Sequence, residues 1–181
     1  MTILTARHTA DLSAADRAEL RALLDTVFAD HEGGYDDTDF EHGLGGWHVL
    51  VHDGGVLVGH GAVVRRQFLL GGRALPVGYV ENVAVAVSHR RRGLGSAVMG
   101  ELERVVLAGH GAGFLAASAE GAPLYERRGW RVWRGPLSVL TVEGVRRTPE
   151  EEDGGVRVLD PDRTWDVEQD LVCEWRSGDV W

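Results

Sequence analysis

Apolar residues recur at helical spacing over residues 13–28 of the chain. Positions three and four apart lie on one face of a helix, so this stretch predicts an amphipathic helix with one buried face. Ser13, followed by Asp16 three residues later, has the arrangement of a capping box and marks where the helix begins. The apolar face consists of Leu20, Leu23, Leu24, Val27 and Phe28.

Residues 47–87 follow a different pattern, in which runs rich in β-branched and aliphatic residues alternate with short glycine-containing turns. Asp53-Gly54-Gly55 separates the first two runs, and Gly71-Gly72-Arg73 separates the next two. Turns of this composition join neighbouring antiparallel strands. The pattern therefore predicts two successive hairpins, an antiparallel meander whose last strand leads into residues 80–87.

Helical and strand-like stretches alternate along the second half of the chain. A crossover through a helix makes the strands on either side of it parallel, so the strand over 114–118 should run parallel to the strand over 80–87. The elements expected are a helix from Gly93 to about Ala108, a strand over 114–118, a helix over 119–128 ended by Gly129, and strands over 130–133 and 171–175.

Together these elements predict a single α+β domain over residues 1–181, with a central mixed, mostly antiparallel sheet and helices on both faces. The hydrophobic content of 44% and the charged content of 26% are those of a soluble globular protein. No apolar run approaches the length of a membrane span, and the N-terminus lacks the apolar core of a signal peptide. We therefore expect a cytoplasmic protein.

The formal net charge of −9 argues against nucleic acid or an anionic membrane as the partner and leaves room for a cationic one. Cys173 is the single cysteine, which excludes an internal disulfide. Because it lies in an alternating, strand-like run, it is expected to be a small core residue rather than a nucleophile. The eight histidines show no ligand spacing, so no metal site is expected.

Part of the negative charge is concentrated in two stretches of the chain. Residues 30–41 contain six acids among twelve residues, and Glu150-Glu151-Glu152-Asp153 forms a second cluster. The first stretch reads either as a solvated loop or as an acidic wall for a positively charged substrate, and the sequence alone leaves both open.

The stretch from Gly78 to Val98 combines a strand, a basic glycine-containing loop and the start of a helix. The loop contains Arg90-x-x-Gly93-x-Gly95. Glycines let a ligand approach the backbone, and the first turn of a helix presents amides and the positive end of a dipole. The arrangement predicts a pyrophosphate site with arginines beside it. The alternative is a capped turn whose arginines are solvated.

The loop resembles the acyl-coenzyme A signature of the GNAT acetyltransferases, Arg/Gln-x-x-Gly-x-Gly/Ala after a strand. Leu124-Tyr125 and Gly129-Trp130 resemble the second half of the same pattern. The resemblance implies acetyl-CoA as the acetyl donor. The cofactor-binding residues it implies are Val83, Ala84, Val85, Arg90, Arg91, Arg92, Gly93, Leu94, Gly95, Ser96 and Ser118.

Several further segments narrow the resemblance to the aminoglycoside 2′-N-acetyltransferases, notably the Gly178-Asp179-Val180-Trp181 terminus. This family implies Glu81 as general base through ordered water, Tyr125 as general acid, and the Trp181 carboxylate as part of the site. Asn82 stands where the family usually has Gly or Ala, which implies a narrower acceptor pocket. The substrate-binding residues implied are Asp36, Asp39, Glu81, Asn82, Glu152, Asp179 and Trp181.

The implied function is direct acetyl transfer to the 2′-amino group of an aminoglycoside in a ternary complex, which would confer resistance to the antibiotic. One alternative is a GNAT enzyme for another cationic amine, such as a polyamine or a cellular aminosugar. Another is a drug-binding protein without turnover, against which the presence of Glu81 and Tyr125 argues. The family also implies a homodimer, for which the apolar, tryptophan-rich C-terminal half could supply the interface.

Overall fold

The computed structural model describes residues 1–30 and 34–181, which form two compact units. Unit 1 comprises Met1–Val64 and Val80–Val105, and unit 2 comprises Arg65–Tyr79 and Val106–Trp181. Strands β3 (Val56–Leu70) and β4 (Arg73–Val85) contribute residues to both. The acidic stretch 30–41 includes His31, Glu32 and Gly33, which lie outside the described residues.

In unit 1, β1 (Thr2–His8) pairs antiparallel with β2 (Trp47–Asp53), which pairs antiparallel with β3. Gly54 and Gly55, with φ of 60° and 87°, form the turn between β2 and β3 because a left-handed backbone suits glycine. β4 is the next strand beside β3. The predicted meander of two hairpins is therefore confirmed.

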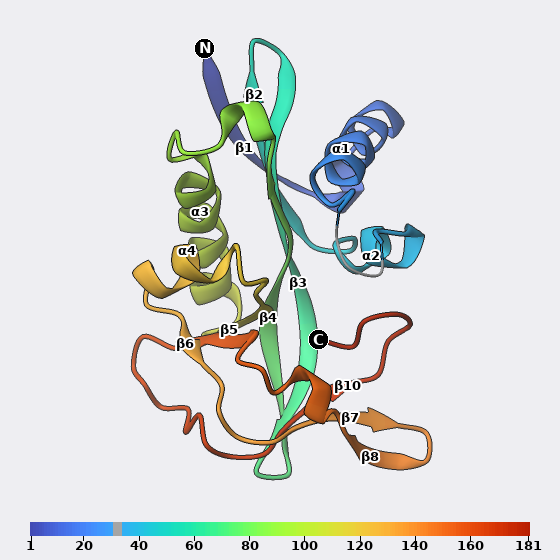
Figure 1. Cartoon of the computed structure of the whole chain (residues 1–181), viewed down its shortest axis with the longest axis vertical. Coiled ribbons are helices and arrows are strands. Elements are labelled where there is room, and N and C mark those ends of the chain that lie inside the picture. The colour runs from blue at the N-terminus through green and yellow to red at the C-terminus, as the bar shows by residue number, and fades with distance from the viewer. Residues whose placement is uncertain (31–33) are drawn as a thin grey trace. The chain divides into compact units, whose positions relative to one another are not determined.

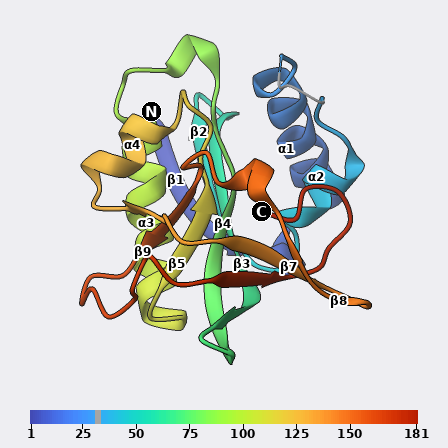
Figure 2. The same cartoon turned by 60° about the horizontal axis from the view of Figure 1, so that its bottom comes forward.

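Helices cover both faces of the unit 1 strands (Figures 1 and 2). Helices α1 (Ala14–Val27) and α2 (Asp37–His42) lie on one side, and α3 (Leu94–Gly109) lies on the other. On the α3 side, a Cβ added at Gly61 would come within 2.7 Å of Leu102, so this glycine allows the helix to pack closely. On the other side, the buried core consists of Leu12, Leu20, Leu23, Leu24, Leu50, Leu57 and Ala84.

Helix α1 confirms the element predicted for residues 13–28 and its start signal. The Ser13 hydroxyl accepts a hydrogen bond from the Asp16 amide at 3.1 Å, and the Asp16 carboxylate accepts one from the Ser13 amide at 2.8 Å. This reciprocal capping box satisfies two amides that the helix itself leaves without a partner.

Of the two interpretations left open for the first acidic stretch, the solvated loop is wrong for α2, which is a helix. The Asp36 carboxylate accepts hydrogen bonds from the Thr38 and Asp39 amides at 2.7 and 3.1 Å, and the Asp39 carboxylate accepts one from the Asp36 amide at 2.9 Å. These bonds form a second capping box, which stabilises a short helix where acid content alone indicated solvated chain.

Unit 2 supplies the remaining strands. β5 (Gly113–Ala116) runs parallel to β4, with Gly78 opposite Gly113, as the crossover predicted. The hairpin of β7 (Leu137–Thr141) and β8 (Gly144–Arg147) is visible in Figures 1 and 2. β9 (Val156–Leu159) pairs antiparallel with β5 and β6, and β10 (Leu171–Glu174) pairs antiparallel with β3 and parallel with β7. The other elements are α4 (Ala122–Arg127), β6 (Arg131–Val132) and the short 3-10 helices Thr9–Asp11, Val87–His89 and Pro149–Glu151.

Aromatic rings fill the core of unit 2. The ring of Phe68 lies 4.9 Å from that of Phe114 and 5.6 Å from that of Trp181, measured between centroids. Cys173 is a buried free thiol, as expected from its strand pattern. Across the described residues, no helix is long and apolar enough to cross a bilayer.

Candidate active site

The loop between β4 and α3 has the geometry of an anion site. Arg91 and Gly93 both adopt left-handed backbone, with φ of 60° and 81°. The Ala97 amide bonds the Gly93 carbonyl at 3.0 Å, so the Leu94 and Gly95 amides come before the hydrogen-bond ladder of α3. Together with the exposed guanidinium of Arg91, these amides make the end of the 16-residue helix suitable for a phosphate.

Arg90 has a different place from the other two arginines of the loop. Its Nε donates to the Val85 carbonyl at 3.3 Å, which ties the loop back to the end of β4. Arg92 is exposed, like Arg91. Two of the three predicted arginines therefore face solvent, whereas Arg90 supports the loop.

Glu81 and Asn82 lie half-buried in β4, directly before Val83, Ala84 and Val85. Asn82 has a left-handed backbone with φ of 53°, which interrupts the regular strand conformation. The Asn82 side-chain amide donates to the Asp39 carbonyl at 3.2 Å. Unit 1 therefore brings Asn82 together with the N-terminal turn of α2, although the Asp36 and Asp39 carboxylates already cap that helix.

Behind this part of β4 lies a row of buried polar side chains that the sequence analysis missed. Thr9 Oγ1 is 2.7 Å from His48 Nε2, His48 Nδ1 is 3.0 Å from His60 Nε2, and His60 Nδ1 is 2.9 Å from the Asn82 carbonyl oxygen. Burial lowers the pKa of His48 to about 4 and that of His60 to about 3. Both rings are therefore neutral at neutral pH.

These two histidines predict a loss of stability in acid. The folded state holds both pKa values below the ordinary 6.5, so stability is fully present above about pH 6.5 and decreases as pH falls. At about pH 5, each histidine should cost about 2 kcal/mol relative to neutral pH, because the unfolded chain binds its proton.

Urea unfolding at both pH values measures this difference. Replacement of His60 by glutamine should remove about half of the histidine contribution, since His48 still titrates only in the unfolded chain. An unchanged dependence of the free energy of unfolding on pH in the variant would contradict the assignment.

Unit 2 holds Tyr125 and Ser118 close together. Tyr125 lies on α4 and is 8% exposed, and burial raises the pKa of its hydroxyl to about 12. A Cβ added at Gly121 would lie 3.1 Å from the Tyr125 ring and 3.5 Å from Ser118 Oγ. The hydroxyl of Tyr125 therefore keeps its proton at neutral pH, as a general acid requires.

Arg157 is a further residue that the sequence analysis missed. It lies on β9, is 4% exposed, and its Nη2 donates to Glu126 Oε1 at 3.1 Å. Its Nε and Nη1 have no hydrogen-bond partner among residues 1–30 and 34–181. The charge of Arg157 opposes the rise in the pKa of Tyr125 and thereby favours the tyrosinate. Its position inside the apolar run Val156–Leu159 was the available signal.

The C-terminal residue, Trp181, is buried against unit 2. The Trp181 indole N–H donates to Thr148 Oγ1 at 2.9 Å, and the Trp181 amide donates to the Asp179 carboxylate at 2.9 Å. Arg176 Nη2 donates to the Trp181 carbonyl oxygen at 2.6 Å. Arg66 Nη2 donates to the Val180 carbonyl at 2.8 Å. These bonds hold Val180 and Trp181 against the rest of the unit.

Glu152 is already engaged within the protein. Its carboxylate accepts a hydrogen bond from the Leu137 amide and pairs with Arg147, which lowers its pKa. Glu151 is half-buried instead, and burial together with Asp179 raises its pKa. Of the second acidic stretch, Glu151 therefore shares the electrostatic environment of Asp179.

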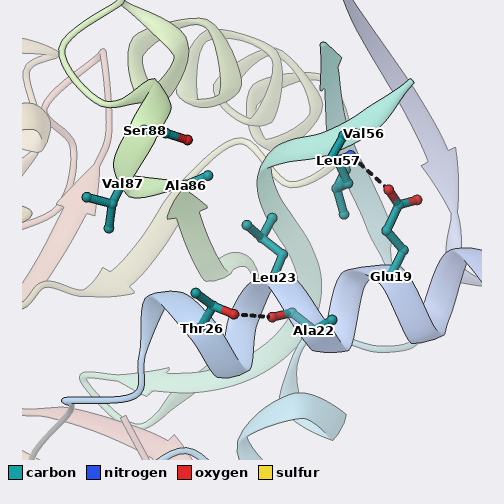
Figure 3. Close-up of a pocket in the computed structure, with 9 residues that line it drawn as sticks. All are labelled: Glu19, Ala22, Leu23, Thr26, Val56, Leu57, Ala86, Val87 and Ser88. Atoms are coloured by element: carbon teal, nitrogen blue, oxygen red, sulfur yellow. Dashed lines mark hydrogen bonds between the residues drawn. The ribbon is translucent and has the colours of Figure 1, made fainter. Parts of the chain in front are cut away.

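A shallow apolar groove of about 620 Å³ lies elsewhere on unit 1 (Figure 3). Its polar groups bond within the protein, since Glu19 accepts from the Leu57 amide and Thr26 donates to the Ala22 carbonyl. It contains none of the predicted site residues. In the described part of the chain, no group of three or more His, Cys, Asp or Glu side chains could hold a metal ion. The groove is lined by Glu19, Ala22, Leu23, Thr26, Val56, Leu57, Ala86, Val87 and Ser88.

Comparison with known proteins identifies the family of the chain. Residues 8–133 match the family model of the acetyltransferase (GNAT) domain. The chain is 41% identical over 177 residues to the aminoglycoside 2′-N-acetyltransferase of Mycolicibacterium fortuitum. The aligned residues make up 96% of this chain and 89% of that protein.

Solved structures give the same fold. Escherichia coli ElaA superposes with a TM-score of 0.61 at 16% identity, covering 88% of this chain and 100% of that one. A GNAT family acetyltransferase from Brucella melitensis, solved in complex with acetyl-CoA, also gives a TM-score of 0.61 at 16% identity and covers 97% of each chain. The matching family model and the similarity along nearly the whole chain show that this protein belongs to the GNAT acetyltransferase family.

Proposed function

We propose that this protein is an acetyl-CoA-dependent N-acetyltransferase that acetylates the 2′-amino group of aminoglycosides. The observation that carries the proposal is the 41% identity to the Mycolicibacterium fortuitum enzyme across 96% of the chain, which includes both units. We place the reaction in the cytoplasm, where acetyl-CoA is available. Loss of the positive charge on the acetylated amine would weaken the binding of the drug to an anionic target and so confer resistance.

The reaction forms a C–N bond between the acceptor amine and the acetyl carbon and breaks the C–S bond of the thioester. The protonated amine loses two protons, one that Glu81 accepts through a water molecule before the attack and one that passes to solvent as the amide forms. The departing thiolate gains one proton, which Tyr125 donates. The two protein groups then exchange protons with solvent. No acetyl-enzyme is required, and Cys173 is buried with a pKa that burial raises to about 12.

Binding of the donor falls to unit 1 in this proposal. The Arg91 guanidinium and the amides ahead of α3 would hold the pyrophosphate, and the backbone of Val83–Val85 would hold the pantetheine arm. The left-handed Gly93 and the amides that precede the α3 ladder support this role.

Two related acceptors test the function. Tobramycin carries a 2′-amino group, whereas kanamycin A carries a hydroxyl at that position. We expect the protein to release CoA thiol from acetyl-CoA with tobramycin and not with kanamycin A. Turnover of both would move the acetylated position, and turnover of neither would overturn the acceptor assignment while leaving a GNAT enzyme for another amine.

Electrostatic attraction should contribute to acceptor binding. Asp36 and Asp39 at the start of α2 supply negative charge that attracts a polycationic drug to unit 1. Between about 0.05 M and about 0.5 M salt, screening should raise the KM for tobramycin several-fold while kcat changes little. Initial rates at constant saturating acetyl-CoA measure the effect, and a KM independent of salt would refute the contribution of the acids.

The β7–β8 hairpin supports a homodimer as part of the proposal. Val142 is 99% exposed, and Leu140, Val145 and Trp175 also present apolar surface to solvent. Such surface favours association with another protein surface. Light scattering after gel filtration should give twice the chain mass, and an aspartate at Val142 should reduce it to the chain mass.

A further inference from the structure

The hydrogen bonds of the buried row Thr9–His48–His60 share one donor-to-acceptor direction, and the last of them ends at the Asn82 carbonyl in the candidate site. A carbonyl oxygen can only accept, so His60 Nδ1 carries the proton that bonds the Asn82 carbonyl. His60 Nε2 must then accept from His48 Nδ1–H, and His48 Nε2 must accept from the Thr9 hydroxyl.

The far end of the row is anchored in the same way. The amides of Gly45 and Gly46 donate to Thr9 Oγ1 at 2.9 and 3.2 Å. The Thr9 hydroxyl lies 3.1 Å from the Gly46 carbonyl, which already accepts from the Thr9 amide, and only 2.7 Å from the unprotonated His48 Nε2, so its proton goes to His48. The bonds from Thr9 through His48 and His60 therefore all point toward Asn82. Hydrogen bonds aligned in one direction polarise each other, so the row strengthens the last bond, to the Asn82 carbonyl.

The Asn82 carbonyl and the Val83 N–H belong to one peptide unit. Because a trans peptide is planar, these two groups point in opposite directions. The bond from His60 therefore fixes where the Val83 amide points, even though His60 does not touch that amide. Asn82 also has the left-handed φ of 53°, so its peptide lacks the usual restraint of a regular strand.

The two faces of the sheet show which way the Val83 amide points. His60 is opposite Leu50 in the β2–β3 register, and Leu50 belongs to the core under α1, so His60 faces α1 and α2. The neighbouring Gly61 faces α3, where its added Cβ would meet Leu102 and Val98. The Val83 amide thus points away from the α1 face, and the loop before α3 leads to the opposite face.

We propose that Thr9, His48 and His60 are positioning residues that aim the Val83 amide at the thioester oxygen of acetyl-CoA. This inference rests on the proposed function, in which negative charge develops on that oxygen during transfer. An amide held in place before the reaction stabilises such charge without reorganisation. The row satisfies every ring nitrogen of both histidines, and a task at the site accounts for the presence of two polar rings in an otherwise apolar core.

The experiment follows the carbonyl band of acetyl-CoA labelled with carbon-13 at the acetyl carbonyl, by infrared difference spectroscopy on the bound complex. In the wild-type protein, binding should shift the band to lower wavenumber because the amide polarises the carbonyl. His60→Phe should reduce this shift by at least half. Thr9→Val, which is nearly isosteric, should reduce it less, and His60→Gln, which keeps an N–H donor, should restore part of it.

In the same variants, the decrease in kcat should parallel the decrease in the band shift. Loss of one oxyanion donor costs about 10²–10³ in kcat, so a misdirected donor in His60→Phe should cost about 10-fold to 100-fold, with the KM for acetyl-CoA within about threefold. His52→Gln, on β2 and outside the row, is the matched control and should leave both readouts unchanged. Thermal unfolding verifies that each variant is folded.

These measurements distinguish a failure of the positioning role from a failure of the proposed acetyltransferase function. The band measurement needs no acceptor, so failure to acetylate tobramycin with a normal band shift overturns the proposed function alone. A full band shift in folded His60→Phe overturns the positioning role, whatever happens to kcat. If His60→Phe does not fold, Thr9→Val decides, and an unchanged band and kcat in that variant would also overturn it.

Discussion

Replacement of Glu81 by glutamine should lower kcat for tobramycin by about 10²–10⁴-fold. The acceptor amine is protonated near neutral pH and has no lone pair for attack on the thioester. A positioned carboxylate that accepts the proton through water restores the lone pair, and the glutamine amide cannot. Glutamine has nearly the same shape, so the KM for acetyl-CoA should change less than threefold. Initial rates of thiol release measure both parameters.

The pH profile makes this first prediction more specific. Without a base, the residual rate should increase with pH as more of the acceptor becomes a free amine. Glu143→Gln, an exposed carboxylate on the turn between β7 and β8, serves as the control and should keep wild-type rates. A Glu81→Gln variant with kcat within threefold of wild type would contradict the general-base role.

Replacement of Tyr125 by phenylalanine should lower kcat by about 10²-fold or more, because the CoA thiolate then leaves without a proton. Burial holds the pKa of Tyr125 at about 12, so the acid is fully protonated, and the nearby charge of Arg157 stabilises the tyrosinate that forms. The variant retains the ring that packs edge-on against Trp130, so the free energy of unfolding should change little.

The leaving group distinguishes an acid from a packing residue. An acetyl thioester of a more acidic thiol needs less protonation, so the deficit of Tyr125→Phe should shrink with that donor. Tyr35→Phe is the control, since the Tyr35 hydroxyl is buried without a hydrogen-bond partner in the described part of the chain. A deficit that is equal for both donors would contradict the role of Tyr125 as an acid.

The sequence was sufficient where neighbouring residues determine the structure. Ser13 and Asp16 lie three residues apart and form their capping box locally, so α1 could be predicted with its start. The Gly54-Gly55 turn likewise determines the hairpin that surrounds it. The basic loop before α3 is also local, because its glycines and arginines follow one another directly.

The features that the sequence did not predict have two physical causes. Helix α2 was missed because the acid content of residues 30–41 outweighed a capping signal, Asp36 with Asp39, that the sequence did contain. The pairing of Glu152 with Arg147 and the burial of Arg157 depend on how β7, β8 and β9 pack together, and these strands were not predicted.

The histidine row combines both causes. His48 and His60 belong to facing strands of a predicted hairpin, and counting residues from the Gly54-Gly55 turn brings them near each other. Their link to Asn82 depends on a left-handed residue in β4 that no local signal marked. The sequence therefore contained the histidine pair but not its target.

The position of the acetyl group on the product tests the central claim most directly. Tobramycin acetylated by the protein should be isolated and its proton–carbon correlations measured by NMR. The product should carry one new amide, with the proton on the 2′ carbon shifted downfield and the other amine-bearing positions unchanged. An acetyl group on any other amine, or no acetylated product, would contradict that claim.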